Sequence, residues 1–355
     1  MQPRWNIPLT GGGVGGIAAD QRYVIVGSRD PADQQDLFEC YDAATGQLVW
    51  GAFTAAPGQL DYGNSPRATP LLAEGFVYTL GAFGDLSALD LETGALLWTK
   101  NLVRDLGGTM PEWGYAASPL LIGETLIVQP GGPETSLVGL DCYSGDLLWQ
   151  AAGKEAAYAS LIPNSLTNPA FIAGLDVEGV CGWDLKGKLL WKLKPDVDGD
   201  FGVPSPVLTK QGLVASSENN GTRLYPWEAK QQHPTETAIA HQPKANPNSH
   251  TPIVVGDHLI VAGRRLECYD LENDLQLLWS VFDRDLKGYV SLLATEQRIL
   301  ACTQNGTLLL LSPQSGEILG RLSLTDRPVR LLAHPAIVGN QLYVRVHDRL
   351  MRIDL

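Results

Sequence analysis

The residue types best able to do chemistry in this chain are its six histidines, its five cysteines and one short acidic run. The histidines lack the HxH or HExxH spacing that places two imidazoles on one metal ion. The cysteines are odd in number and contain no CxxC pair, so neither a disulfide framework nor a zinc knuckle is indicated. Cys40 and Cys268 share a Glu-Cys-Tyr-Asp context, which predicts a small buried residue at a repeated strand position.

Four short strings match functional motifs but favour structural interpretations. Asp196-Val-Asp198-Gly-Asp200 resembles a calcium loop, but its glycine comes too early and no glutamate follows at the required distance, which favours a solvated loop. Gly11-x-Gly13-x-x-Gly16 precedes a strand rather than the helix that a dinucleotide site needs. Asn220-Gly-Thr222 and Asn305-Gly-Thr307 are glycosylation sequons, yet Asn-Gly is also the preferred hairpin turn. No nucleophile elbow is present.

A recurring phrase, Asp-x-x-x-Gly-x-x-x-Trp, organises the chain. Its regular copies run from Asp42 to Trp50, from Asp90 to Trp98 and from Asp141 to Trp149, and looser copies end at Trp191 and Trp279. The phrase predicts a β-hairpin, because the aspartate can accept backbone N–H groups of the turn and the glycine can reverse the chain. One hairpin cannot bury the tryptophan ring, whereas stacked repeats can.

The spacing of the phrase predicts the number of repeats. Intervals of 45, 48, 51 and 42 residues separate Trp5, Trp50, Trp98, Trp149 and Trp191, and the 88 residues to Trp279 make two further periods. The chain ends on Arg352-Ile-Asp354-Leu, and the strand that should follow is found at Pro3 to Ile7. We therefore expect an all-β, eight-bladed β-propeller of four-stranded antiparallel blades, with the N-terminal strand completing the last blade and closing the ring. Residues 1–355 are expected to form a single domain.

Each predicted blade opens with small residues and proline, as at Asn64-Ser-Pro-Arg67 and Trp113-Gly-Tyr115. The first strand of each blade lines the central channel, where only small residues pack closely. The larger members of these phrases are then expected at one mouth of the channel, where the aromatic rings would stack on a planar ligand face and Arg67 would hold an anion. These candidate ligand contacts are Asn64, Arg67, Trp113, Tyr115, Tyr158, His250, Tyr289 and His334.

The composition limits the partners of the protein. A formal net charge of -13 argues against nucleic acid and anionic membranes, which require a basic surface. No apolar run approaches the length of roughly 18 residues that spans a bilayer, so no membrane insertion is expected. The N-terminus enters the closing strand without a signal peptide, which predicts either a cytoplasmic protein or a mature form of an exported one. We expect a monomer.

The repeated Leu-Asp-x-x-Thr-Gly-x-x-x-Trp phrase resembles the PQQ-like repeat, which quinoprotein dehydrogenases share with BamB-like outer-membrane assembly lipoproteins. The segments from Trp5 to Gly13, from Trp113 to Leu120 and from Val128 to Gly132 are similar to those of bacterial PQQ-like repeat proteins of undefined role. This resemblance covers the whole chain. The repeat residues are structural, so it implies the fold more strongly than the function.

The resemblance implies three functions. The first is a non-catalytic scaffold or sensor that binds a protein partner or a small ligand at the channel mouth. The second is a minimal quinoprotein dehydrogenase for alcohols or sugars, using pyrroloquinoline quinone (PQQ) and calcium. Such enzymes stack the quinone between a tryptophan and two adjacent cysteines, which this chain lacks, although Trp183 or Trp227 could stack and Glu218-Asn219-Asn220 could supply oxygen ligands. The third is a BamB-like assembly scaffold, which implies the periplasm.

Overall fold

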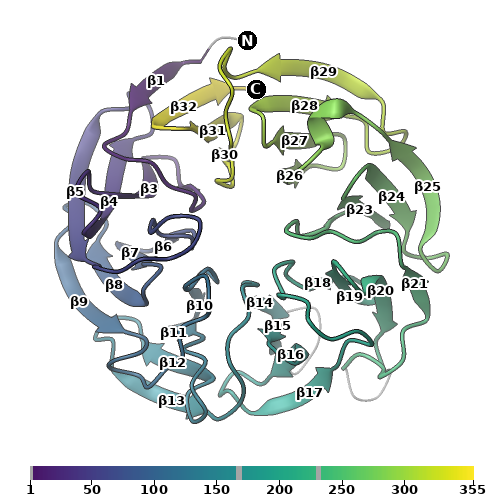
Figure 1. The fold of residues 1–355 in the computed structure, drawn as a ribbon, viewed down its shortest axis with the longest axis horizontal. Coiled ribbons are helices and arrows are strands. Elements are labelled where there is room, and N and C mark those ends of the chain that lie inside the picture. The colour runs from purple at the N-terminus through teal and green to yellow at the C-terminus, as the bar shows by residue number, and fades with distance from the viewer. Residues whose placement is uncertain (1–2, 165–169, 229–232) are drawn as a thin grey trace. The chain divides into compact units, whose positions relative to one another are not determined.

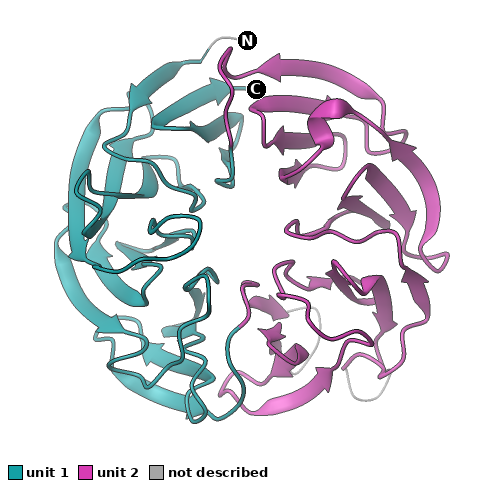
Figure 2. Ribbon diagram, in the orientation of Figure 1, with its two compact units in different colours: residues 1–156, 331–355 teal, residues 157–330 magenta. Residues whose placement is uncertain are grey.

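The computed structural model describes residues 3–164, 170–228 and 233–355. The described chain contains eight four-stranded antiparallel sheets and one 3-10 helix, η1 (Arg284–Leu286). These sheets are the blades of an eight-bladed β-propeller, as the repeat spacing predicts (Figure 1). By its contacts the chain divides into two compact units, Met1–Ala156 with Leu331–Leu355 and Ala157–Arg330 (Figure 2). The expectation of a single domain stays a prediction.

The first unit holds four blades. Blade 1 consists of β2 (Ala18–Ala19), β3 (Tyr23–Arg29), β4 (Gln35–Asp42) and β5 (Leu48–Ala55). Blade 2 consists of β6 (Leu71–Ala73), β7 (Phe76–Leu80), β8 (Asp85–Asp90) and β9 (Leu96–Asn101). Blade 3 consists of β10 (Leu120–Ile122), β11 (Thr125–Val128), β12 (Leu137–Asp141) and β13 (Leu147–Ala151). Blade 8 consists of β30 (Ala336–Val338), β31 (Gln341–Val346), β32 (Arg349–Asp354) and the N-terminal strand β1 (Trp5–Pro8).

The second unit holds the other four blades. Blade 4 consists of β14 (Ile162–Asn164), β15 (Phe171–Asp176), β16 (Gly179–Trp183) and β17 (Leu189–Leu193). Blade 5 consists of β18 (Val207–Leu208), β19 (Gly212–Ser217), β20 (Gly221–Pro226) and β21 (Ala240–Gln242). Blade 6 consists of β22 (Ile253–Val255), β23 (His258–Ala262), β24 (Leu266–Asp270) and β25 (Gln276–Val281). Blade 7 consists of β26 (Val290–Ala294), β27 (Ile299–Thr303), β28 (Thr307–Leu311) and β29 (Ile318–Ser323).

The N-terminal strand completes the last blade, as predicted. Strand β1 pairs antiparallel with β32, with Trp5 opposite Arg352 and Pro8 opposite Arg349. The fully buried Arg345 of β31 strengthens this junction, because its guanidinium donates to the carbonyl oxygens of Gly27 (2.6 Å) and Gly11 (2.8 Å). The two ends of the chain are therefore held by both a strand ladder and a buried cation.

The repeated phrase forms the predicted hairpin between the third and fourth strands. In blade 2, Asp90 Oδ1 accepts the backbone N–H (2.8 Å) and the hydroxyl (2.6 Å) of Thr93, and Gly94 has a φ of +71°. A β-bulge follows, because Ala88 pairs with Trp98 while Leu89 pairs with Leu96, leaving one extra residue between them. The bulge breaks the alternation, so that Leu96 and Leu97 are both exposed while the Trp98 ring is buried.

Four of the repeated tryptophan rings pack on the turn of the next blade. Trp50 of blade 1 donates its indole N–H to the Leu91 carbonyl oxygen of blade 2 (2.9 Å), and its ring lies against Gly94. Trp5, Trp98 and Trp279 repeat this contact, donating to the carbonyl oxygens of Ala43, Cys142 and Pro313. A buried or half-buried ring and one satisfied donor thus join each of these blades to its neighbour.

Two tryptophans depart from this arrangement. The rings of Trp149 and Trp191 lie over Gly139 and Gly182, their cross-strand partners in their own blades. A β-carbon at Gly182 would lie 2.1 Å from the Trp191 ring. In blade 5, which follows Trp191, β20 and β21 are joined by a long connection rather than by the regular turn. Within the described residues, the buried indole N–H of Trp191 has no hydrogen-bond acceptor.

The packing of Trp50 on Gly94 generates a stability prediction. A methyl group at Gly94 would lie 2.6 Å from the Trp50 ring, whereas a methyl group at Gly75, with a φ of +76°, would meet open space. Both alanine variants carry a left-handed residue, at a cost of about 1–2 kcal/mol. Gly94→Ala adds a clash of about 1–3 kcal/mol. Urea unfolding should therefore show Gly94→Ala to be clearly less stable than Gly75→Ala, and equal losses would contradict the proposed contact.

Candidate functional site

The blade-opening residues nominated from the sequence fall in both compact units. Each phrase precedes or begins the first strand of its blade, as expected. The first unit contains Asn64, Arg67, Trp113, Tyr115 and His334, and the second contains Tyr158, His250 and Tyr289. We describe each group by itself, and their gathering around a single mouth stays a prediction.

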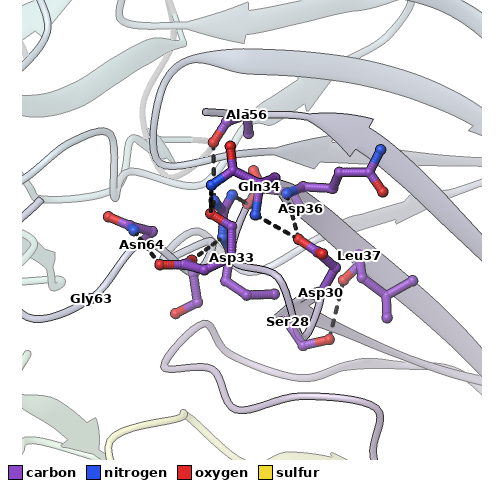
Figure 3. Close-up of polar contacts among 12 residues, drawn as sticks. Ser28, Asp30, Asp33, Gln34, Asp36, Leu37, Ala56, Gly63 and Asn64 are labelled. Atoms are coloured by element: carbon purple, nitrogen blue, oxygen red, sulfur yellow. Dashed lines mark hydrogen bonds and ion pairs between the residues drawn. The ribbon is translucent and has the colours of Figure 1, made fainter. Parts of the chain in front are cut away.

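In the first unit, the buried Arg29 at the end of β3 organises the surrounding loops. Its guanidinium pairs with Asp36 Oδ1 (2.8 Å) and Asp33 Oδ1 (2.8 Å). It also donates to the carbonyl oxygens of Asp33 (2.8 Å) and Ala56 (3.0 Å). Figure 3 shows Asp33, Asp36 and Ala56 close together in this network. One side chain thereby ties the turn between β3 and β4 to the end of β5.

Asn64 extends this network into the loop formed by residues 56–67. Its amide nitrogen donates to Asp33 Oδ2 (2.7 Å; Figure 3), and its amide oxygen accepts the backbone N–H of Leu60 (2.8 Å). Arg67 closes the same loop by donating to the carbonyl oxygens of Asp61 (2.9 Å), Gly63 (2.9 Å) and Ser65 (3.1 Å). These bonds give the backbone of a segment without strands a fixed set of partners. The structure thus gives Asn64 and Arg67 a bracing role that the sequence did not suggest.

The 56–67 loop presents an aromatic pair. Tyr62, held at a φ of +67°, is 71 % exposed, and its ring makes an edge contact with the half-buried Trp113 ring at a centroid distance of 6.0 Å. Tyr115, two residues further on, is buried, and its hydroxyl donates to the Pro130 carbonyl oxygen (2.8 Å). Burial also raises the pKa of Tyr115. The exposed Tyr62 ring thus lies beside a half-buried Trp113 ring, while the buried Tyr115 ties this segment to the carbonyl oxygen of Pro130.

In the second unit, His250 and Tyr289 come together from blades 6 and 7. Their ring centroids lie 5.3 Å apart, and His250 is buried. Burial raises the pKa of Tyr289 to about 12, so its phenol is neutral at physiological pH. Tyr158, before β14, donates its backbone N–H to the Gly202 carbonyl oxygen (3.2 Å). In the first unit, His334 lies just before β30 and is exposed.

A hollow of about 350 Å³, which the sequence did not reveal, lies between the β15–β16 and β19–β20 hairpins and residues 193–202. Asp200, on its wall, accepts hydrogen bonds from the backbone N–H of Asn219 (2.9 Å), from the side-chain amides of Asn219 and Asn220, and from the Ser217 hydroxyl. Asp196 pairs with Arg223 (2.7 Å). The acidic run therefore binds its neighbours in the protein. The acidic run at 196–200 and the string at 218–220 can both be seen in the sequence, but the sequence does not show that they are in contact.

The residues nominated for a quinone and its calcium ion do not fit that role. Trp183 is buried, and Trp227 packs edge-on against Phe171 while its indole N–H donates to the Thr209 carbonyl oxygen (2.8 Å). The Asn220 amide oxygen accepts the Val197 N–H (2.9 Å), and a Glu218 carboxylate oxygen accepts the Asn248 amide (2.6 Å). These rings and oxygens are already engaged within the protein.

The cysteines behave as the repeat context predicts. All five are buried, and Cys40 and Cys268 each face the tryptophan of their own blade across the strand pair. Burial raises the pKa of Cys40 and of Cys268 to about 12, so neither thiol is a nucleophile at neutral pH. Among the described residues, no group of three or more His, Cys, Asp or Glu side chains is placed to hold a metal ion. Within the same residues, no helix has the length and apolarity needed to cross a membrane.

The fold and its repeat define the class of this protein as a PQQ-like β-propeller. The family described as outer membrane protein assembly factor BamB matches residues 2–152, 33–273 and 184–355, and the chain belongs to this family.

The chain is also similar to individual relatives in sequence and to solved structures in fold. The chain is 24 % identical over 182 residues to outer membrane protein assembly factor BamB of Yersinia pestis, a match covering 49 % of this chain and 41 % of the relative. The match thus spans less than half the length of that protein. Among solved structures, BamB from Moraxella catarrhalis superimposes with a TM-score of 0.71 at 18 % identity, covering 100 % of this chain and 97 % of that one. Quinohemoprotein alcohol dehydrogenase from Comamonas testosteroni gives a TM-score of 0.69 at 14 % identity, covering 99 % and 76 %.

The Arg29 network generates a prediction about pH. Burial raises the pKa of Asp36 to about 6, above the ordinary value of 3.8. Between these two pH values the folded state binds more protons than the unfolded state, so stability falls as pH rises from 4 to 6 and levels off above. The shift corresponds to about 3 kcal/mol. In urea unfolding, Asp36→Asn should gain stability relative to the wild type over this interval. A pH-independent difference between the two proteins would contradict the raised pKa.

Proposed function

We propose that this chain is a non-catalytic scaffold that holds a protein partner on the loops leading into its blades. The observation that carries the proposal is the 56–67 loop, which has no strand yet is fixed by Arg29, Asn64 and Arg67. It displays Tyr62 beside Trp113. A preformed surface loses little conformational entropy on binding, and Tyr and Trp are enriched among the residues that dominate binding energy.

The family membership supports a particular kind of partner. The relatives from Yersinia pestis and Moraxella catarrhalis carry the name BamB, and the first is described as an outer membrane protein assembly factor. We therefore place this chain in the periplasm, with a component of the outer membrane protein assembly machinery as its partner. The other candidates from the blade openings, His334 of the first unit and Tyr158, His250 and Tyr289 of the second, enter the proposal as further contacts.

The proposal predicts a position-specific cross-link. A photo-reactive phenylalanine analogue replacing Tyr62 should give, in the source bacterium, an adduct with an outer membrane protein assembly component. The same analogue at Leu96, which is 58 % exposed on β9 of the same unit, is the matched control and should give none. The double variant Tyr62→Ala, Trp113→Ala should weaken binding to the identified component at least about tenfold, because it removes two contact rings. Equal adducts at both positions, or unchanged affinity, would sink the proposal.

The enzyme alternative is tested separately with the purified protein. Because Trp183 and Trp227 are packed and the nominated oxygens are engaged, we expect calorimetric titration with PQQ and calcium to show no saturable binding. Dye reduction with a panel of alcohols and sugars should stay at background. Saturable binding of PQQ with turnover would show that the chain is a dehydrogenase. Saturable binding without turnover would show that its ligand is a quinone and would contradict the proposed protein partner.

A further inference from the structure

We propose that a groove across blade 6 is a second binding site, which takes an extended acidic peptide segment. Two adjoining hollows of about 480 Å³ and 450 Å³ form the groove, and they share Asn246, Gly263 and Arg264. Their walls come from residues 243–250 before β22, from the β23–β24 hairpin, and from residues 282–288 after β25. The groove therefore crosses three successive loops of the second unit. A site for a single small anion would not need to extend over so many loops.

The lining of the groove is strongly basic. Lys244, Arg264, Arg265 and Lys287 line the two hollows, against the single carboxylate of Glu267. All four cationic residues are exposed. The Glu267 carboxylate already accepts hydrogen bonds from the Tyr269 hydroxyl (2.7 Å) and the Ser280 hydroxyl (3.3 Å). In a protein with a formal net charge of -13, this is a local excess of positive charge.

The acidic residues near the groove are engaged elsewhere. Asp283 and Asp285 both pair with Arg321, and the Glu218 carboxylate accepts the Asn248 amide (2.6 Å). Within the described chain, neither Lys244 nor Arg264 forms an ion pair. The cations thus remain open to an incoming carboxylate, which an arginine can bind with two parallel hydrogen bonds.

An aromatic ring in the groove favours a peptide over a compact anion. Phe282 is 58 % exposed, and the Arg265 guanidinium and the Lys287 ammonium each lie 5.7 Å from its ring centroid. The two cations hold the ring in place by cation–π attraction. An extended segment can place carboxylates on Arg264 and Arg265 while an apolar side chain covers Phe282.

The groove is tested by charge reversal in the full chain. The probe is a fluorescent decapeptide in which glutamate alternates with leucine, compared with the same peptide carrying glutamine for glutamate. We expect the wild type to bind only the acidic peptide, with affinity that falls as salt rises. The variant Arg264→Glu, Arg265→Glu should lose at least about tenfold in affinity. Its matched control is Lys186→Glu, Lys188→Glu, which makes the same charge change on the exposed β16–β17 turn of the same unit and should bind within about twofold of the wild type.

Several outcomes would contradict the proposal that the groove binds an acidic peptide. These are equal loss in both double variants, equal binding of the glutamine peptide, and tighter binding of pyrophosphate or of single-stranded DNA. Unchanged unfolding midpoints of both variants in urea separate loss of binding from loss of fold. Because none of these substitutions touches the 56–67 loop, failure here leaves the cross-link at Tyr62 as an independent test of the proposed function.

Discussion

The packing of a tryptophan ring on the turn of the following blade is the interaction on which the rest of this structure depends. Trp50 illustrates it, since one ring fills the space above Gly94 and one indole N–H satisfies the carbonyl oxygen of Leu91. The contact constrains three features of the sequence together. The turn must contain a glycine, the fourth strand must bulge to aim the ring inward, and the repeat length must bring the next turn within reach. The repeated phrase from aspartate to tryptophan meets these three requirements together.

The contact is absent where the chain is least regular. Trp191 lies over Gly182 of its own blade, and the blade after it joins its last two strands by a long connection instead of the glycine turn. These same two blades line the 350 Å³ hollow, whose wall is held by Asp200 and Asn220. The hollow thus lies between the hairpins of blades 4 and 5, the same two blades between which the tryptophan contact is missing. The groove at Arg264 likewise lies over loops, beyond the strands that the repeat constrains.

The architecture was predictable because it repeats, and the site was less so because it does not. Five copies of one phrase, together with the spacing of its tryptophans, predicted the number of blades, the burial of Cys40 and the pairing of β1 with β32. The roles of Asn64 and Tyr115 were not predictable, because each depends on where a partner from another loop lies, Asp33 and Pro130 respectively. Arg29 carried a weak signal, as a charge at the end of an otherwise apolar strand beside several aspartates. Only the fold could show that it is buried among them.

The pairing of β1 with β32 has a consequence for how this protein is made. Ribosomes release the chain from its N-terminus, so β1 emerges first, while its partner strand emerges only after more than three hundred further residues. Contacts of such separation in sequence form slowly. During synthesis the apolar face of β1 and the edge of the first-formed sheets stay open to wrong partners. The last blade can therefore close only once β32 is available, and a chain that has not yet released β32 would be a natural client for chaperones.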